Sequence, residues 1–158
     1  MYKALTNRVN APAVWLLNKI GVNKGYDSVK KFGIPVTKSD KNLALALGGL
    51  SKGVSPQELA GAYTAFANSG TRTDTHYIRK IVDASGNVVV NNPKVTTHNV
   101  MSPKVAKQMT SMMLGVFNSG TGVDAKPYGY SVAGKTGSTE ADATGDGDAT
   151  RDKWIVGY

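Results

Sequence analysis

The chain has 158 residues and a mass of 16.6 kDa, enough for one domain or part of a larger one, and its 41% apolar and 19% charged residues exclude a disordered, collagen-like or coiled-coil protein. The absence of cysteine excludes a disulfide scaffold, a thiol nucleophile and a thiolate zinc site. The net charge of +8 is compatible with an anionic partner, but aromatic residues do not alternate with the basic ones, so we expect no nucleic-acid partner.

The first half of the chain predicts helices with clear boundaries. Asn10 followed by Ala-Pro is typical of a helix start, with Asn10 as the N-cap, and Gly21 supplies the stop. A short basic helix is expected over residues 27–32 and a polar loop over residues 37–42. The sequence SPQE at residues 55–58 is a capping box with proline at the first helical position. The helix that begins there carries apolar residues at helical spacing, namely Leu59, Ala62, Tyr63 and Phe66.

A hairpin and a third helix follow. Residues 77–82 and 88–90, joined by the turn Ala-Ser-Gly-Asn, predict a β-hairpin. Ser102 followed by proline opens a helix with an apolar stripe, and we assign the methionines of this stripe and Val116 to the core together with Tyr63 and Phe66. The stripe consists of Val105, Met109, Met112, Met113 and Val116.

The C-terminal region allows two interpretations. Residues 130–137 alternate like a strand, and residues 153–158 begin another strand after an acidic, glycine-rich loop; the abrupt end of that strand suggests a fragment. Residues 129–136 also match the phosphate-loop expression G-x-x-x-x-G-K-[ST]. A phosphate loop needs a helix after its lysine, because the helix N-terminus binds the phosphates, but an acidic loop follows here. We therefore favour the strand over nucleotide binding.

Two possible metal sites are weak. The acidic residues over 142–153 have the spacing of a calcium loop, but Lys153 stands where a bidentate glutamate belongs, so we favour a solvated loop. His76 and His98 have no partner at ligand spacing. We expect neither a metal nor an organic cofactor.

The sequence Lys135-Thr136-Gly137 at the end of an exposed strand suits acyl transfer. This chemistry needs a cation and a hydroxyl to bind a substrate carboxylate, and backbone N–H groups aimed at the developing oxyanion. An edge strand supplies both, and its glycine lets a substrate lie close to the backbone as an added strand. K-T-G is the third signature of serine penicillin-binding proteins and related β-lactamases, beside S-x-x-K and S-x-N.

Most of the chain resembles the C-terminal part of the transpeptidase domain of penicillin-binding proteins, most closely the bifunctional class A type. The segments that carry this resemblance follow one another in the family's order. They are NAPAV (10–14), LALGG (45–49), VSPQELA (54–60), AY (62–63), FANSG (66–70), GTG (120–122), GKTGST (134–139) and DKWIVGY (152–158).

The chain departs from the family pattern at the first two signatures. S-x-N reads Arg8-Val9-Asn10, and arginine cannot relay a proton at neutral pH. The position is substituted, Thr6 nearby compensates, or the enzyme is impaired. The family's S-x-x-K lies upstream of S-x-N, before residue 1. Formal matches inside the chain at residues 28–31 and 85–87 are as frequent as chance predicts, and they fall on a short surface helix and in a turn, so we reject them.

The resemblance implies an α+β fold of the penicillin-binding protein and β-lactamase type, with an antiparallel sheet flanked by helices. Residues 1–158 would form the C-terminal portion of a transpeptidase domain. The implied activity is peptidoglycan cross-linking, in which a serine attacks a D-Ala-D-Ala stem peptide, releases D-Ala and passes the acyl group to an amine on a neighbouring peptide. β-Lactams acylate the same serine. The alternatives are a carboxypeptidase or β-lactamase relative, and a non-catalytic wall-binding module of the same fold.

The resemblance also assigns roles to residues. Asn10 would position the substrate amide, and Lys135 and Thr136 would hold the terminal carboxylate. Beside Gly137, the backbone N–H of Ser138 would supply half of the oxyanion hole, and Thr139 would line the cleft. The implied partners are stem peptides, β-lactams and the upstream half of the same domain. The apolar stretches are far shorter than the roughly 18 residues of a membrane span. The resemblance implies that an upstream helix would anchor the full-length protein at the extracytoplasmic face of the cell membrane.

Overall fold

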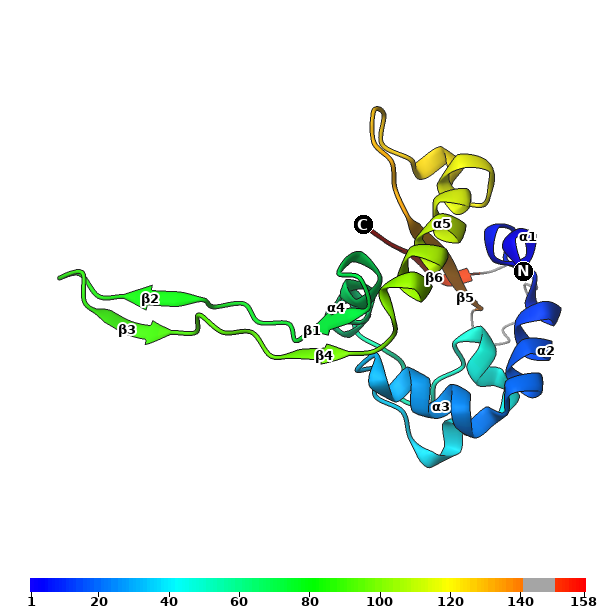
Figure 1. Cartoon of the computed structure of the whole chain (residues 1–158), viewed down its shortest axis with the longest axis horizontal. Helices are drawn as coiled ribbons and strands as arrows, with labels where there is room; N and C mark the ends of the chain where they lie inside the picture. The colour runs from blue at the N-terminus through cyan, green and yellow to red at the C-terminus, as the bar shows by residue number, and fades with distance from the viewer. Residues whose placement is uncertain (141–149) are drawn as a thin grey trace.

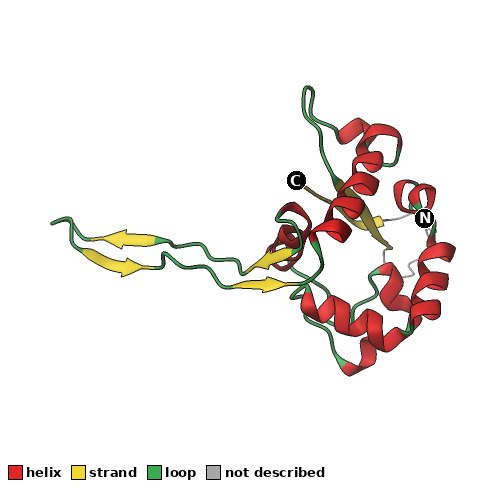
Figure 2. Ribbon diagram, viewed as in Figure 1, coloured by secondary structure: helices red, strands yellow, loops and turns green. Residues whose placement is uncertain are grey.

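The computed structural model describes residues 1–140 and 150–158, which form a mixed α+β fold with a long arm that projects from a helical body (Figure 1). The helices gather in the body, where one pair of strands also lies, and the arm is built of strands and loops (Figure 2). Across the described residues, every helix falls short of the length and apolar content that a membrane span requires. The helices are α1 (Tyr2–Thr6), α2 (Asn10–Ile20), α3 (Val22–Lys31), α4 (Pro56–Ala67) and α5 (Pro103–Ser119), with 3-10 turns η1 (Lys38–Asp40), η2 (Leu43–Leu47) and η3 (Val123–Ala125).

The start of the chain differs from the predicted boundaries. Asn10 is the first residue of α2 rather than its cap; Val9 occupies the cap position, and no side-chain cap hydrogen bond forms. Gly21 has a φ of 93° between α2 and α3, a conformation that only glycine adopts readily. Because the chain turns there at once, α3 begins at Val22 and is longer than the helix predicted over residues 27–32.

The polar stretch predicted as a loop over residues 37–42 is folded around one carboxylate. Asp40 is 2% exposed and accepts hydrogen bonds from the backbone N–H groups of Thr37, at 2.6 Å, and Ser51, at 2.7 Å. These bonds stabilise the ionised form and lower the pKa of Asp40 to about 2. The same loop leads into η2, where the Asn42 side-chain oxygen accepts a hydrogen bond of 2.8 Å from the Ala44 N–H.

The capping box that opens α4 is confirmed. The Ser55 hydroxyl accepts a hydrogen bond from the Glu58 N–H, and the Glu58 carboxylate accepts one from the Ser55 N–H at 2.7 Å.

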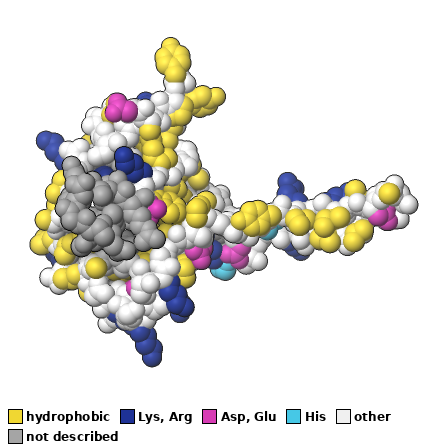
Figure 3. Space-filling view, turned by 180° about the vertical axis from the view of Figure 1, so that it is seen from behind, with side chains coloured by type: hydrophobic (Ala, Val, Ile, Leu, Met, Phe, Trp, Pro, Cys, Tyr) yellow, Lys and Arg dark blue, Asp and Glu magenta, His cyan; other side chains and the backbone are white. Residues whose placement is uncertain are grey.

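The predicted hairpin forms the outer half of the arm. β2 (Lys80–Val82) pairs antiparallel with β3 (Val88–Asn91), and this pair projects far from the body (Figure 1). The sequence pattern missed β1 (Thr71–Thr73) and β4 (Thr97–Asn99), which pair at the base of the arm and contain only polar residues. Apolar side chains are exposed along the arm (Figure 3).

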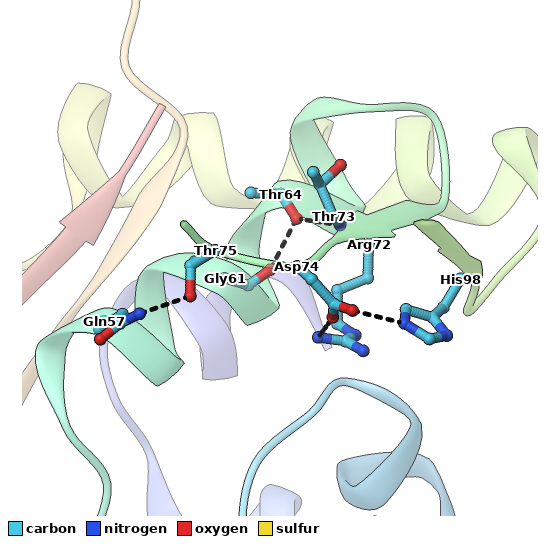
Figure 4. Close-up of polar contacts among 8 residues, drawn as sticks. All are labelled: Gln57, Gly61, Thr64, Arg72, Thr73, Asp74, Thr75 and His98. Atoms are coloured by element: carbon cyan, nitrogen blue, oxygen red, sulfur yellow. Dashed lines mark hydrogen bonds and ion pairs between the residues drawn. The ribbon is translucent and has the colours of Figure 1, made fainter. Parts of the chain in front are cut away.

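Polar contacts attach the base of the arm to α4 (Figure 4). Asp74 binds Arg72 at 2.8 Å and His98 at 3.1 Å, which joins the two base strands. The Thr64 hydroxyl of α4 accepts a hydrogen bond from the Thr73 N–H at 2.9 Å. The base of the arm is therefore held to the body, although its strands are short.

The core is built around α5, as its apolar stripe predicts in part. Met113, Val116 and Phe117 are at most 2% exposed, and they lie with the buried alanines of α4 and with Ala133. Val105, which belongs to the same stripe, is 44% exposed: it faces solvent in the first turn of α5, whereas its neighbour Ala106 is buried. The remaining predicted core residues are half-buried, namely Met109, Met112, Tyr63 and Phe66.

Two glycines let other elements approach α5 and β6 closely. A Cβ on Gly115 of α5 would overlap the Tyr2 ring and the Thr6 methyl group of α1. A Cβ on Gly134 would overlap the carbonyl of Val156, and Phe117 of α5 lies against the same position. Gly134 opens β5 (Gly134–Glu140), which pairs antiparallel with β6 (Thr150–Gly157). Thus α5 contacts both α1 and β5.

We predict that Met113→Ala lowers the free energy of unfolding by about 2 to 5 kcal/mol, because it removes buried methylenes and leaves a cavity. Val105→Ala, on the same helix, should change the free energy by no more than about 0.5 kcal/mol, since its side chain is exposed. Denaturant unfolding monitored by circular dichroism measures both. Equal midpoints for the two variants would show that the buried face of α5 is assigned wrongly.

Candidate active site

The K-T-G sequence lies near the start of β5. The strand begins at Gly134, later than the predicted residue 130, because the chain over 130–133 runs as a loop until Ala133 meets the C-terminus. Ala133 and Tyr158 exchange two backbone hydrogen bonds of 3.0 Å. Since β5 continues through Lys135, no helix N-terminus follows the lysine, which is the feature that a phosphate loop would need.

The pairing of β5 with β6 sets the direction of its amides. In an antiparallel pair, residues that exchange hydrogen bonds alternate with residues that do not. The pair Ala133 and Tyr158 exchanges both bonds, and the register is regular as far as Thr139. The alternation therefore directs the N–H groups of Thr136 and Ser138 away from β6, to the open edge of β5. This is the direction that an oxyanion-hole amide requires.

A pocket of about 330 Å³ lies along this edge. It brings together residues that are far apart in the sequence: Asn10, at the start of α2, faces the same cavity as four consecutive residues of β5. α1 and η2 also contribute to its wall. The polar and glycine residues that line it are Arg8, Asn10, Lys135, Thr136, Gly137 and Ser138.

Thr139 is not among the residues that line the pocket. Its hydroxyl donates a hydrogen bond of 2.9 Å to the Asp152 carboxylate and accepts one of 3.0 Å from the Asp152 N–H. These contacts direct it toward β6. The role expected for Thr139 in lining the cleft stays a prediction.

Arg8 occupies the place where S-x-N has serine. Its φ of 55° lies in the left-handed region, and its Nη1 donates a hydrogen bond of 3.1 Å to the Ser138 hydroxyl across the pocket. Thr6, the candidate substitute for the missing serine, is 3% exposed and donates its hydroxyl to the Lys3 carbonyl at 3.2 Å. The Thr6 hydroxyl is thus engaged within α1 and does not line the pocket.

The electrostatics of the pocket are dominated by two cations. Burial first, and the positive charge of Arg8 second, lower the pKa of Lys135 to about 8. The Lys135 ammonium donates a hydrogen bond of 3.1 Å to the Thr136 carbonyl. The Thr136 hydroxyl shares a hydrogen bond of 2.6 Å with the hydroxyl of Thr121, which lies in the G-T-G segment.

The competing motifs do not reach this pocket. Ser28 donates its hydroxyl to the Lys24 carbonyl at 2.8 Å within α3, and Ser85 lies in the turn at the tip of the arm. His98 pairs with Asp74 at the base of the arm. The candidate calcium loop over 142–153 lies mostly outside the described residues. Among those described, no three His, Asp or Glu side chains are grouped to hold a metal ion.

Sequence reasoning missed part of the pocket wall. The G-T-G segment was recognised, but nothing in its pattern indicated that Thr121 would bond Thr136. Thr121 lies behind Thr136 and is not itself among the lining residues, whereas the apolar residues Ala46 and Leu47 of η2 line the pocket, and no local signal separates them from core residues.

Comparison with known proteins gives a consistent result over the whole chain. Residues 1–158 match the family model described as the penicillin binding protein transpeptidase domain. The chain is 42% identical over 160 residues to penicillin-binding protein 2a of Streptococcus pneumoniae serotype 2, and 44% identical over 158 residues to penicillin-binding protein 1F of Bacillus subtilis. Both alignments cover 100% of this chain and 21% of the relative, so the chain spans about a fifth of the length of these relatives.

Solved structures share the fold. The D,D-transpeptidase domain of a peptidoglycan glycosyltransferase from Eggerthella lenta superposes with a TM-score of 0.78 at 23% identity, covering 99% of this chain and 44% of that one. Penicillin-binding protein A from M. tuberculosis, solved as an imipenem acyl-enzyme complex, gives a TM-score of 0.81 at 18% identity, covering 99% of this chain and 39% of that one. At these identities the likeness concerns the fold alone.

We predict that Arg8→Gln raises the pKa of Lys135 part of the way toward its ordinary value. Only part is recovered because burial, the larger cause of the shift, remains. The side-chain resonances of Lys135, followed by NMR from pH 6 to 11, measure the change. Arg79→Gln on the arm removes the same charge far from the pocket and should leave the titration unchanged; an unaltered Lys135 pKa in Arg8→Gln would contradict the interaction.

Proposed function

Because the chain belongs to the transpeptidase domain family of penicillin-binding proteins, we propose that its pocket is the carboxylate-binding side of a serine D-Ala-D-Ala transpeptidase active site. The observation that carries this proposal is the grouping of Asn10 with residues 135–138 in one cavity. A cation, hydroxyls and outward backbone amides then face the same space, which is the set of groups that acyl transfer requires.

The proposed reaction is acyl transfer in two steps. A serine hydroxyl attacks the carbonyl carbon between two D-Ala residues, an ester forms, and the terminal D-Ala leaves as its amide nitrogen takes up a proton. An amine of a neighbouring stem peptide then attacks the ester, forms the cross-link and releases the serine. The oxyanion that develops in each step needs donors that are in place beforehand.

The residues of this chain take up the following roles. Lys135 and Thr136 bind the terminal carboxylate of the substrate, and the Asn10 side chain positions the amide of the peptide. The N–H of Ser138 donates a hydrogen bond to the oxyanion from the open edge of β5. Gly137, with no side chain, lets the substrate lie along that edge as an added strand.

The nucleophilic serine belongs, in this proposal, to a part of the protein outside residues 1–158. Two observations support this: the alignment covers 44% of a solved transpeptidase domain, and Ser138, the serine that lines the pocket, engages Arg8 through its hydroxyl. The chain is then the C-terminal portion of the domain. Its partners are the nucleophile-bearing portion, stem peptides and β-lactams.

The proposed setting is peptidoglycan synthesis at the extracytoplasmic face of the cell membrane, in a bifunctional class A protein anchored by a segment outside this chain. The similarity to penicillin-binding proteins 2a and 1F supports this assignment. A wall-binding role without catalysis is the second candidate, because Arg8 replaces a serine and cannot relay a proton at neutral pH. A carboxypeptidase would use the same pocket, with water in place of the amine.

We predict that residues 1–158 alone form no covalent adduct with a fluorescent penicillin, whereas the complete domain that carries them is labelled. In that domain Lys135→Ala should slow acylation about 10- to 100-fold, because it removes a charge-assisted hydrogen bond to the drug carboxylate. Lys80→Ala on the arm is the matched control and should react at the wild-type rate. Gel fluorescence against time measures all three.

Two results would count against this assignment. A covalent band from residues 1–158 alone that Ser28→Ala abolishes would place the nucleophile on α3. A complete domain that is folded but never labelled would favour the wall-binding role.

A further inference from the structure

Arg8 is a charged residue of the pocket that the proposed transpeptidase chemistry does not use. It lies in the turn between α1 and α2 and adopts a φ of 55°, which is uncommon for a residue other than glycine, asparagine or aspartate. Such conformations persist where the surrounding structure determines them, and they concentrate at functional sites.

The position of Arg8 is fixed from both sides. On the helical side, the close approach at Gly115 holds α1 against α5, and the Thr121 N–H donates a hydrogen bond of 3.2 Å to the Thr6 carbonyl. On the pocket side, the guanidinium donates to the Ser138 hydroxyl at 3.1 Å. The guanidinium therefore lies over the residue whose N–H faces the open edge of β5.

The charge of Arg8 is not neutralised within the described part of the pocket. No aspartate or glutamate is among the described residues that line it, and the ion pairs among the side chains that the structure describes, those of residues 1–139 and 152–158, lie at the base of the arm, around Asp74. After burial, the positive charge of Arg8 is the second cause of the lowered pKa of Lys135, because two cations in one cavity repel each other. A cavity with two unneutralised cations is complementary to an anion.

We propose that Arg8 is a second carboxylate-binding residue of this pocket, which binds the C-terminal carboxylate of the substrate together with Lys135. This inference rests on the proposed function, and it explains why the site would prefer a substrate with a free carboxylate. Of the five N–H donors of a guanidinium, the contact with Ser138 uses one, so others are free to bind a carboxylate oxygen while Lys135 and Thr136 bind the second oxygen.

Arg8 and Lys135 together would discriminate between a peptide with a free C-terminal carboxylate and one with a neutral amide more strongly than Lys135 alone. A bound carboxylate removes the repulsion between the two cations as well as forming hydrogen bonds, so its binding is coupled to proton uptake by Lys135 near pH 8. A peptide that ends in a neutral amide gains neither effect. The change in the ratio of the two affinities when Arg8 is replaced therefore measures the contribution of Arg8.

The test is a binding cycle on the 158-residue chain, followed by NMR titration. The two probes are N-acetyl-D-Ala-D-Ala and its C-terminal amide. Their affinities are measured for the wild type and for the pocket variants Arg8→Gln, Arg8→Asn and Lys135→Met. Arg79→Gln, on the arm, is the control. Gln keeps a donor for Ser138, and Asn tolerates the left-handed φ, so either neutral variant suffices if its spectrum shows the wild-type fold. We expect each to reduce the preference for the carboxylate about tenfold, while Arg79→Gln retains it.

The possible results separate this inference from the proposed function. If the wild type prefers the carboxylate and Lys135→Met loses that preference while both Arg8 variants keep it, the role of Arg8 is refuted and the proposed function stands. If the wild type binds both probes equally, the pocket is not a carboxylate site and both proposals fail. An Arg8 variant that weakens both probes by the same factor would indicate a structural role and would also refute the inference.

Discussion

The packing of α1 and β5 against α5 is the interaction on which the pocket depends. Gly115 leaves room for Tyr2 and Thr6 of α1, and Phe117, two residues further on, lies against Gly134 at the start of β5. The two walls that carry Arg8 and Lys135 are thus held by the same segment of one helix. A side chain at Gly134 would also meet the Val156 carbonyl and separate β5 from β6.

In this arrangement, different segments of the chain supply different functional groups to the pocket. The α1–α2 turn supplies a guanidinium and an amide side chain, and β5 supplies an ammonium, hydroxyls and outward backbone N–H groups. The Asp40 network orders the loop before η2, which closes the pocket with apolar residues. Burial first, and the positive charge of Arg8 second, lower the pKa of Lys135. In the proposed role, a bound carboxylate would offset the repulsion between these two cations.

Local sequence signals predicted the elements whose ends are chemically marked. The capping box at Ser55 and the proline after Ser102 located α4 and α5, and the turn at residues 84–87 located the hairpin. The predicted ends of elements were wrong where contacts between distant segments determine them. Asn10 lies inside α2, and β5 starts only where Ala133 pairs with Tyr158. The K-T-G strand and Asn10 were recognised by their resemblance to a family. The contact between Arg8 and Ser138, 130 positions apart, had no local signal.

The central claim is that residues 135–138 and Arg8 bind the carboxylate side of an acylated ligand. A crystal structure of the complete domain after reaction with a β-lactam tests it most directly. The drug carboxylate should lie within hydrogen-bond distance of Lys135, Thr136 and Arg8, and the acyl carbonyl oxygen should accept a hydrogen bond from the Ser138 N–H. A drug whose carboxylate points away from β5, with Arg8 still bound only to Ser138, would contradict the claim.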